Sequence, residues 1–203
     1  VDGKGVLGSD DPLNKYYAYG IRNSFGIGFD AVTGNLWETE NGRSTDDEIN
    51  LVLPGFNSGW REVIGFSNET DEFNEENLET FGGNGIYRDP EFIWRDTIAP
   101  TSILFIHTDN LGPKYKDNMF VGSVKNGTIF NFPLDQNRTH LVLTGPLADK
   151  TADNNQETGS VTFGRNFGII TDLEIGPDGN LYVLSNYKHD GTVFKVSAKT
   201  NMN

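Results

Sequence analysis

Short apolar runs recur along the whole chain, and turn-forming residues separate them. The runs are rich in Val, Ile, Phe, Tyr and Leu, and clusters of Gly, Pro, Asn and Asp interrupt them. Such a pattern is typical of β-strands joined by tight turns. No sustained helical period is visible, and only the stretch from Glu75 to Thr80 has the pattern of one or two helical turns. The pattern therefore predicts an all-β protein.

A unit of strand, turn and aromatic-bearing strand occurs in three places, at residues 26–41, 115–132 and 172–196. This spacing fits one propeller blade per roughly 40 to 60 residues, with another blade between the first two copies. We therefore expect a β-propeller of four-stranded blades with about four blades present, either a small closed ring or part of a larger one. A β-sandwich is the alternative, because its strands also recur at short intervals.

The chain is expected to form one propeller domain, possibly a partial one, over residues 1–203. Two long polar segments interrupt the strand pattern, at 66–85 and 148–168. The first holds six acidic residues and no Lys or Arg, so we expect a solvated loop, with a lid or mouth as the alternative. Five large aromatic residues are expected to fill the space between the sheets. They are Trp37, Trp60, Trp94, Phe120 and Tyr182.

Charge and composition narrow the range of partners. The 16 Lys and Arg against 29 Asp and Glu give a formal net charge of −13, which repels nucleic acid and anionic membranes. No apolar run is long enough to cross a bilayer, and the first residues do not have the pattern of a secretion signal. With no cysteine, the chain has neither disulfides nor thiol chemistry. We expect no nucleic-acid partner and no membrane insertion.

The stretch YGIRNSFGIGFDAVTGNLWETENGRSTDDEINLVLPGFNSGW, residues 19–60, has a specific order of short motifs. Arg-Asn, Leu-Trp, Asp-Glu-Ile-Asn-Leu, Pro-Gly and Gly-Trp follow one another at the spacing found in the glucose/sorbosone dehydrogenase family, which includes the aldose sugar dehydrogenases. The chain resembles this family of soluble quinoproteins over most of its length, through 98–109, 118–130 and 172–186. The resemblance implies a six-bladed propeller, of which this chain is similar to the C-terminal part.

The resemblance implies a site for pyrroloquinoline quinone (PQQ) on one end of the propeller. Arg22 and Asn23 match the pair that lies along the quinone, and Lys125 matches a lysine that faces a cofactor carboxylate. Because PQQ carries three carboxylates, a chain of charge −13 needs local cations to bind it. Arg43 and Arg165 are further candidates for that role.

The resemblance also implies two Ca²⁺ sites. The carbonyl oxygens of Gly42 and Arg43 match those that hold the ion beside the quinone. Glu48 and the carbonyl of Ser58 match a second, structural site of the aldose-type members. Ca²⁺ takes six to eight oxygen ligands, and the neighbouring Asp46-Asp47 pair makes this stretch rich in oxygen donors.

In two respects the chain departs from the family pattern. The histidine that serves the family as catalytic base lies upstream of everything that aligns, so His107, His140 and His189 do not match it. Two arginines that hold PQQ carboxylates are replaced by Ile169 and Thr171.

Two functions are therefore expected from the sequence. One is a PQQ- and Ca²⁺-dependent dehydrogenase, which moves hydride from a sugar hydroxyl to the quinone and whose base is not in this chain. The isolated chain is then weakly active or inactive. The alternative is a non-catalytic, Ca²⁺-stabilised propeller that binds or supports other molecules. The resemblance implies an extracellular or periplasmic location and a small sugar as substrate. An incomplete ring implies a second chain or a homo-oligomer that completes it.

Overall fold

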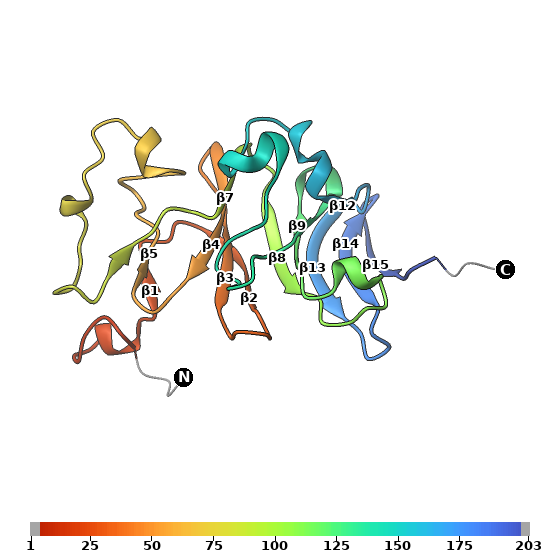
Figure 1. Ribbon diagram of the computed structural model, residues 1–203, viewed down its shortest axis with the longest axis horizontal. Coiled ribbons are helices and arrows are strands. Elements are labelled where there is room, and N and C mark those ends of the chain that lie inside the picture. Colours follow the sequence, from red (N-terminus) through yellow and green to blue (C-terminus); the bar gives the residue numbers. More distant parts are fainter. Residues whose placement is uncertain (1–4, 200–203) are drawn as a thin grey trace.

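The computed structural model describes residues 5–199, and these form an arc of β-sheets (Figure 1). The all-β expectation is confirmed: every helical segment in this range is a short 3₁₀ turn of three to five residues. None of them has the length or the hydropathy of a membrane span. The 3₁₀ turns are Leu13–Lys15, Ser67–Glu69, Glu75–Asn77, Pro113–Tyr115, Lys125–Gly127, Gly145–Asp149 and Glu157–Val161.

Blade 1, the first large sheet, has the strand order β11-β7-β4-β3-β2. Neighbouring strands are antiparallel except β11, which runs parallel to β7. The strands are β2 (Ser24–Phe29), β3 (Leu36–Glu40), β4 (Thr45–Val52), β7 (Phe92–Asp96) and β11 (Thr151–Ala152).

Blade 2 has the order β12-β10-β9-β8 and is antiparallel throughout. Its strands are β8 (Pro100–Phe105), β9 (Met119–Ser123), β10 (Ile129–Phe132) and β12 (Thr162–Gly164).

Blade 3 is a three-stranded antiparallel sheet of β13 (Ile169–Ile175), β14 (Leu181–Tyr187) and β15 (Asp190–Val196). A small parallel sheet, here the side sheet, joins β1 (Ala18–Tyr19), β5 (Phe56–Asn57) and β6 (Ile86–Tyr87). The described residues thus form four sheets, three of which have the shape of propeller blades.

The first strands of the three blades lie side by side on the inside of the arc. Strand β2 packs against β8, and β8 against β13. Gly26 on β2 permits the closest approach, because a Cβ there would lie 2.1 Å from the carbonyl oxygen of Thr101 on β8. The Thr39 hydroxyl completes the contact by accepting from the Gly26 N–H and donating to the same Thr101 carbonyl, both at 3.1 Å.

Each of these inner strands also has a register shift near its first residues. The shifts lie between Ser24 and Gly26 on β2, between Pro100 and Ile103 on β8, and between Ile170 and Asp172 on β13. Such β-bulges bend a strand and leave one residue outside the hydrogen-bond ladder. The three inner strands therefore all depart from regular pairing at the same end of the blades, where each of these strands begins.

Two hydrophobic cores fill the spaces between the blades. One lies between blades 1 and 2 and contains Trp37, Trp94 and Phe130, while the other lies between blades 2 and 3 and contains Phe120. The aromatic residues expected in the core are therefore found there, except that Trp60 and Tyr182 are only half buried.

A buried ion pair also connects blades 1 and 2. Asp30, which follows β2, is fully buried and receives hydrogen bonds from Nε and Nη2 of Arg138. Arg138 Nη2 also donates to the carbonyl of Asp117, which precedes β9. The guanidinium therefore holds together three parts of the chain that are far apart in sequence.

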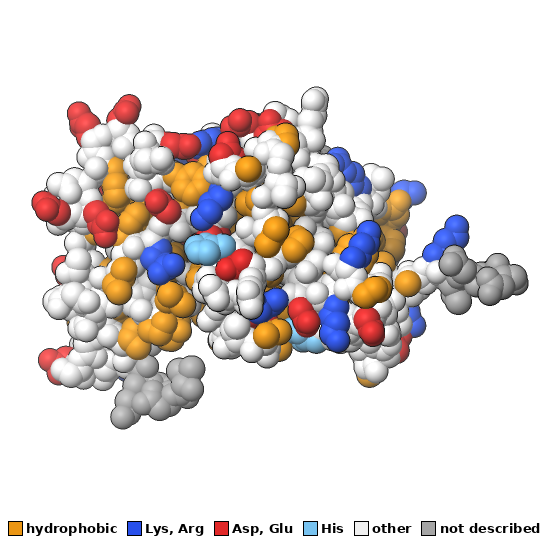
Figure 2. Space-filling view, in the orientation of Figure 1, with side chains coloured by type: hydrophobic (Ala, Val, Ile, Leu, Met, Phe, Trp, Pro, Cys, Tyr) orange, Lys and Arg blue, Asp and Glu red, His pale blue; other side chains and the backbone are white. Residues whose placement is uncertain are grey.

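The two polar segments differ in structure. Residues 66–85 contain no strand, only the 3₁₀ turns Ser67–Glu69 and Glu75–Asn77. They lie at one end of the molecule, where acidic side chains gather on the surface (Figure 2). Residues 148–168 instead include β11, β12 and the 3₁₀ turn Glu157–Val161.

Candidate cofactor and metal site

Arg22 lies just before β2 and is held from three directions. Its Nη1 donates to the carbonyl oxygens of Asn41 and Gly42, at 2.6 and 3.1 Å. Its guanidinium carbon lies 5.3 Å from the ring centre of Trp60, which is the distance of a cation–π contact. The cation is thus fixed beside the loop that joins β3 to β4.

This loop is connected to Lys125 through the carboxylate of Asp47. Asp47 Oδ1 accepts from the Gly42 N–H at 2.9 Å, and Oδ2 accepts from the N–H groups of Ile98 and Ala99, both at 2.7 Å. Lys125 N–H donates to the carbonyl of Ile98, and its Nζ binds Thr97 Oγ1. The structure therefore brings Arg22, Gly42 and Lys125 to the same end of the blades, where the inner strands begin.

Asn23 and Arg43 are exposed at the same end. Asn23 holds the loop through its backbone, because its carbonyl accepts from the N–H of Asn41 at 3.0 Å. The side chains of both residues are therefore available to a bound molecule.

Behind this loop, three buried carboxylates share one face of β3 and β4. The strand register places Glu40 opposite Glu48 and Glu38 opposite Asn50. Directly opposed side chains in a sheet lie about 5 Å apart, and residues at i and i+2 point to the same face. All four side chains therefore meet in one layer, which we call the acidic layer. Each is at most 5% exposed.

The side sheet and the chain that follows it cover the acidic layer. Ser58 Oγ donates to Glu40 Oε2 at 2.7 Å, and the Arg22 N–H donates to Glu40 Oε1 at 2.5 Å. The N–H of Gly65 donates to Glu48 Oε1 at 2.8 Å. Glu40 therefore connects Arg22, at the cofactor side, with Ser58 and Glu48, at the expected metal side.

Burial disfavours the charged form of these carboxyls. It raises the pKa of Glu38 to about 8, with a contribution from the negative charge of Glu40, and the polar side chains of Ser24 and Asn50 oppose the rise. Burial likewise raises the pKa of Glu48 to about 8. The pKa of Glu40 is also raised by burial, although its hydrogen bonds from Ser58 and Arg22 act in the opposite direction.

Glu38, Glu40 and Asn50 were missed by sequence reasoning. The sequence did contain a signal, because Glu38-Thr39-Glu40 and Glu48-Ile49-Asn50 both place polar residues two apart in apolar strands. Alternation of this kind predicts a shared face, but only the observed register shows that the two faces coincide.

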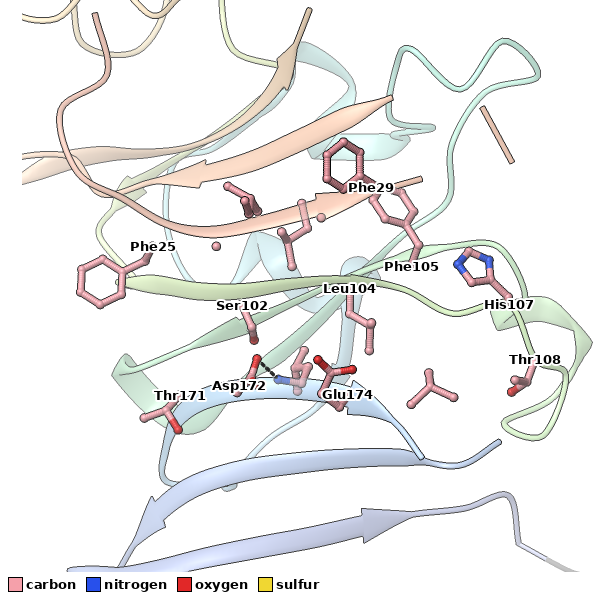
Figure 3. Close-up of a pocket in the computed structure, with 16 residues that line it drawn as sticks. Phe25, Phe29, Ser102, Leu104, Phe105, His107, Thr108, Thr171, Asp172 and Glu174 are labelled. Atoms are coloured by element: carbon pink, nitrogen blue, oxygen red, sulfur yellow. Dashed lines mark hydrogen bonds between the residues drawn. The ribbon is translucent and has the colours of Figure 1, made fainter. Parts of the chain in front are cut away.

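A groove of about 500 Å³ follows the three inner strands (Figure 3). Phe25 and Thr171 lie towards the end that holds Arg22. Asp172 and Glu174 project from β13 towards β8, and His107 lies at the other end. His107 follows β8, roughly 20 Å of extended chain from Pro100 at the start of that strand.

The other two histidines lie in different parts of the molecule. His140 Nδ1 lies 2.9 Å from Glu91 Oε2. His189 occupies the turn between β14 and β15 and lines a pocket with Val124 and Gly127, on either side of Lys125. Ile169 and Thr171 are exposed on β13. Arg165 is also exposed, and its Nη2 donates a hydrogen bond to the Thr162 hydroxyl. His107 and His140 therefore lie away from Arg22, whereas His189 lies in the part of the molecule that holds Lys125.

Comparison with known proteins agrees with the arrangement of the strands. A family model described as Glucose / Sorbosone dehydrogenase matches residues 2–195. The chain belongs to the glucose/sorbosone dehydrogenase family. This family member is 28% identical to aldose sugar dehydrogenase YliI of Escherichia coli over 204 residues, which cover 97% of the chain and 49% of the relative. It is 23% identical to quinoprotein glucose dehydrogenase B of Acinetobacter calcoaceticus, covering 93% of the chain and 48% of that protein.

Solved structures show the same fold. The soluble aldose sugar dehydrogenase of E. coli in its apo-form superposes with a TM-score of 0.67 at 23% identity, covering 98% of this family member and 51% of that chain. The PQQ-bound aldose sugar dehydrogenase of Streptomyces coelicolor gives a TM-score of 0.61 at 19% identity, covering 97% and 49%. The chain therefore spans about half the length of the relatives it matches, and its blades are part of a propeller.

Proposed function

We propose that this chain forms the cofactor-binding half of a PQQ-dependent sugar dehydrogenase. The observation that carries the proposal is the fixed position of Arg22 against the Asn41 and Gly42 carbonyls. Membership of the dehydrogenase family supports it. The substrate class is a small sugar, and the location is extracellular or periplasmic.

The residues at this end suit a flat anion. Arg22 offers a planar cation that Trp60 already orients, and Lys125 and Arg43 add exposed positive charge. Asn23 offers an amide beside them. When bound, PQQ supplies the group that accepts hydride from the sugar. The chain's own contribution is to bind the cofactor's carboxylates and orient its ring.

Ca²⁺ belongs to the same proposal. The Gly42 carbonyl accepts one hydrogen bond from Arg22 and keeps a second lone pair for an ion, which the carbonyl of Arg43 would share. Glu48, with the carbonyl of Ser58, would hold a second ion. Unpaired buried oxygens near Glu48 fit that assignment.

A PQQ titration followed by absorbance, with Ca²⁺ and with chelator, tests the function. The wild type should bind, and Arg22→Gln should bind roughly 10- to 100-fold more weakly, since a hydrogen bond to a charged group contributes about 1.5 to 3 kcal/mol. Lys114→Gln is the control: it removes an exposed cation near Ile106, beyond the end of β8 that is far from Arg22, and should bind as the wild type does. Absence of binding by the wild type would refute the proposal, and equal affinity of Arg22→Gln would refute the site.

A second candidate, a non-catalytic Ca²⁺-stabilised propeller, is favoured by one observation. Ile169 and Thr171 are exposed at the start of β13 and carry no charge, at the positions where the resemblance implies two arginines for the carboxylates of PQQ. PQQ binding separates the two candidates, because the dehydrogenase half must hold the quinone whereas the binding module need not.

We further propose that a second chain or a second copy completes the ring. Phe25, Ile27 and Phe29 on β2 are 61 to 67% exposed, and Leu184 and Val193 on blade 3 are 47 and 62% exposed. Exposed apolar faces of this kind mark a surface for a partner. Light scattering should give a mass above that of the monomer, and a monodisperse monomer would count against this assembly.

A further inference from the structure

The acidic layer gathers three carboxyl groups with which no described cationic side chain forms an ion pair. The groups that contact these carboxyls are neutral. The Ser24 side chain and the Arg22 N–H come from β2 and the turn before it, and the Ser58 hydroxyl and the Gly65 N–H come from the chain that covers the layer. The guanidinium of Arg22 is bonded to Asn41 and Gly42 instead. Among residues 5–199, no Lys, Arg or His forms an ion pair with Glu38, Glu40 or Glu48.

Two oxygen atoms of this layer have no hydrogen-bond partner in the described part of the chain. They are Oε2 of Glu38 and Oδ1 of Asn50, and each residue is only 1% exposed. An unpaired buried oxygen costs about 1 to 3 kcal/mol, and more when it is charged. These two atoms, on directly opposed residues, are therefore acceptors that a cation could bind.

The amide of Asn50 already lies between the two carboxylates. Its Nδ2 donates to Glu38 Oε1 at 2.8 Å and to Glu48 Oε2 at 3.0 Å. Rotation of the amide about its last bond exchanges Nδ2 for Oδ1 and presents an oxygen to the same position. The layer would then offer carboxylate oxygens from both strands with an amide oxygen between them.

We infer that Glu38 and Asn50 are further ligands of the divalent cation proposed at Glu48, with Asn50 Oδ1 replacing Nδ2 when the ion binds. The inference rests on the proposed Ca²⁺ site. No group of three acidic or histidine side chains within 5–199 could hold a metal ion on its own. The ion therefore needs the amide oxygen and backbone carbonyls, which are donors that Ca²⁺ accepts.

Calcium titration calorimetry and thermal unfolding of the purified chain at pH 7.5 test the inference. In the wild type, Ca²⁺ should bind and raise the melting temperature relative to chelator. Glu38→Gln should weaken Ca²⁺ binding at least tenfold and remove most of the shift, although it unfolds at a higher temperature than the wild type in chelator. Asn50→Asp should bind Ca²⁺ more tightly than the wild type and be less stable in chelator, because it replaces a hydrogen-bond donor with a fourth carboxylate in the acidic layer.

Glu91→Gln is the matched control. Glu91 is also buried, but it is paired with Lys150 Nζ at 3.0 Å and with His140, so its loss should lower stability and leave Ca²⁺ affinity unchanged. Wild-type affinity in Glu38→Gln together with lost binding in Glu48→Gln would overturn the inference and leave the proposed Ca²⁺ site standing. Absence of Ca²⁺ binding by the wild type would overturn both.

Discussion

Replacing Glu38 by Gln should stabilise the metal-free protein, and the gain should grow with pH. Glutamine keeps the shape of the side chain and retains an oxygen that can accept from Asn50 Nδ2, as Glu38 Oε1 does at 2.8 Å. It removes the charge that burial disfavours. The variant therefore isolates the free energy of that charge.

The size of the effect follows from the pKa of Glu38. Folding raises this pKa from 4.5 to about 8, so the folded protein keeps a proton that the unfolded chain releases between these values. The free energy of unfolding therefore falls as pH rises through this window. A rise of this size corresponds to about 5 kcal/mol at pH 9, roughly 3 kcal/mol at pH 7 and little near pH 4.5.

Urea unfolding in chelator at several pH values, followed by tryptophan fluorescence, measures these differences. The wild type should lose stability between pH 5 and pH 8.5, and Glu38→Gln should lose clearly less. Glu48 has a pKa raised in the same way, so part of the wild-type slope should remain in the variant. Because Glu38 and Glu48 are neighbours, their contributions need not add.

Two results would refute this reasoning. If Glu38→Gln destabilised the protein at pH 8.5 in chelator, the Glu38 carboxylate would have a favourable interaction that offsets its burial and that is absent from the structure. If the wild type were most stable at pH 8.5, the pKa of Glu38 would be low rather than raised. Glu91→Gln, which breaks a buried ion pair, should be destabilised at pH 7 and so shows that not every buried glutamate behaves in this way.

Three other predictions follow from the fold and the proposed chemistry. Arg138→Ala should cost roughly 3 to 5 kcal/mol in urea unfolding, because it leaves the fully buried Asp30 without its partner, and a loss below about 1 kcal/mol would contradict this assignment. Gly26→Ala should lower the free energy of unfolding by about 1 to 3 kcal/mol, because its Cβ would clash with the Thr101 carbonyl. In Gly191→Ala the Cβ meets nothing within 4 Å, so this control should change stability by less than about 0.5 kcal/mol. Equal melting temperatures of the two variants would show that blades 1 and 2 can move apart without cost. Loaded with PQQ and Ca²⁺, the chain should oxidise aldoses at least about 100-fold more slowly than a complete family member, since a general base contributes about 10²- to 10⁴-fold, and comparable turnover in a dye-reduction assay would show that another residue serves as the base.

The class of fold and the family could be predicted from the sequence, because both depend on local patterns. Apolar alternation and regular turn residues predict strands, and the 19–60 motif order indicates the family; both predictions are confirmed. The assignment of strands to particular sheets could not be predicted from the sequence. The five-stranded blade 1 includes β11, a two-residue strand that lies more than 50 residues after β7 and pairs with it in parallel.

The candidate site was predictable only where a motif marked it. Arg22 and Glu48 lie in the recognised stretch, whereas Glu38 and Asn50 acquire their importance from the register of β3 against β4. Register depends on the packing of both faces of a sheet, which a single chain sequence does not specify. The roles of Arg22, Asn23, Lys125 and Glu48 remain predictions for the titrations above.

The bulges at the start of the three inner strands have a consequence for the dynamics of the site. Residues outside a ladder lack the cooperative protection of their neighbours, so their amides open to solvent at a lower free energy than the regular ends of the same strands. On β2, β8 and β13 these less protected amides lie where the strands begin, next to the loop that joins β3 to β4. Hydrogen exchange should therefore be fastest at this end and slow towards the other end of each strand. A ligand that contacts all three strands there would slow the exchange of these amides. The set of amides that gain protection would then identify the residues that the ligand contacts.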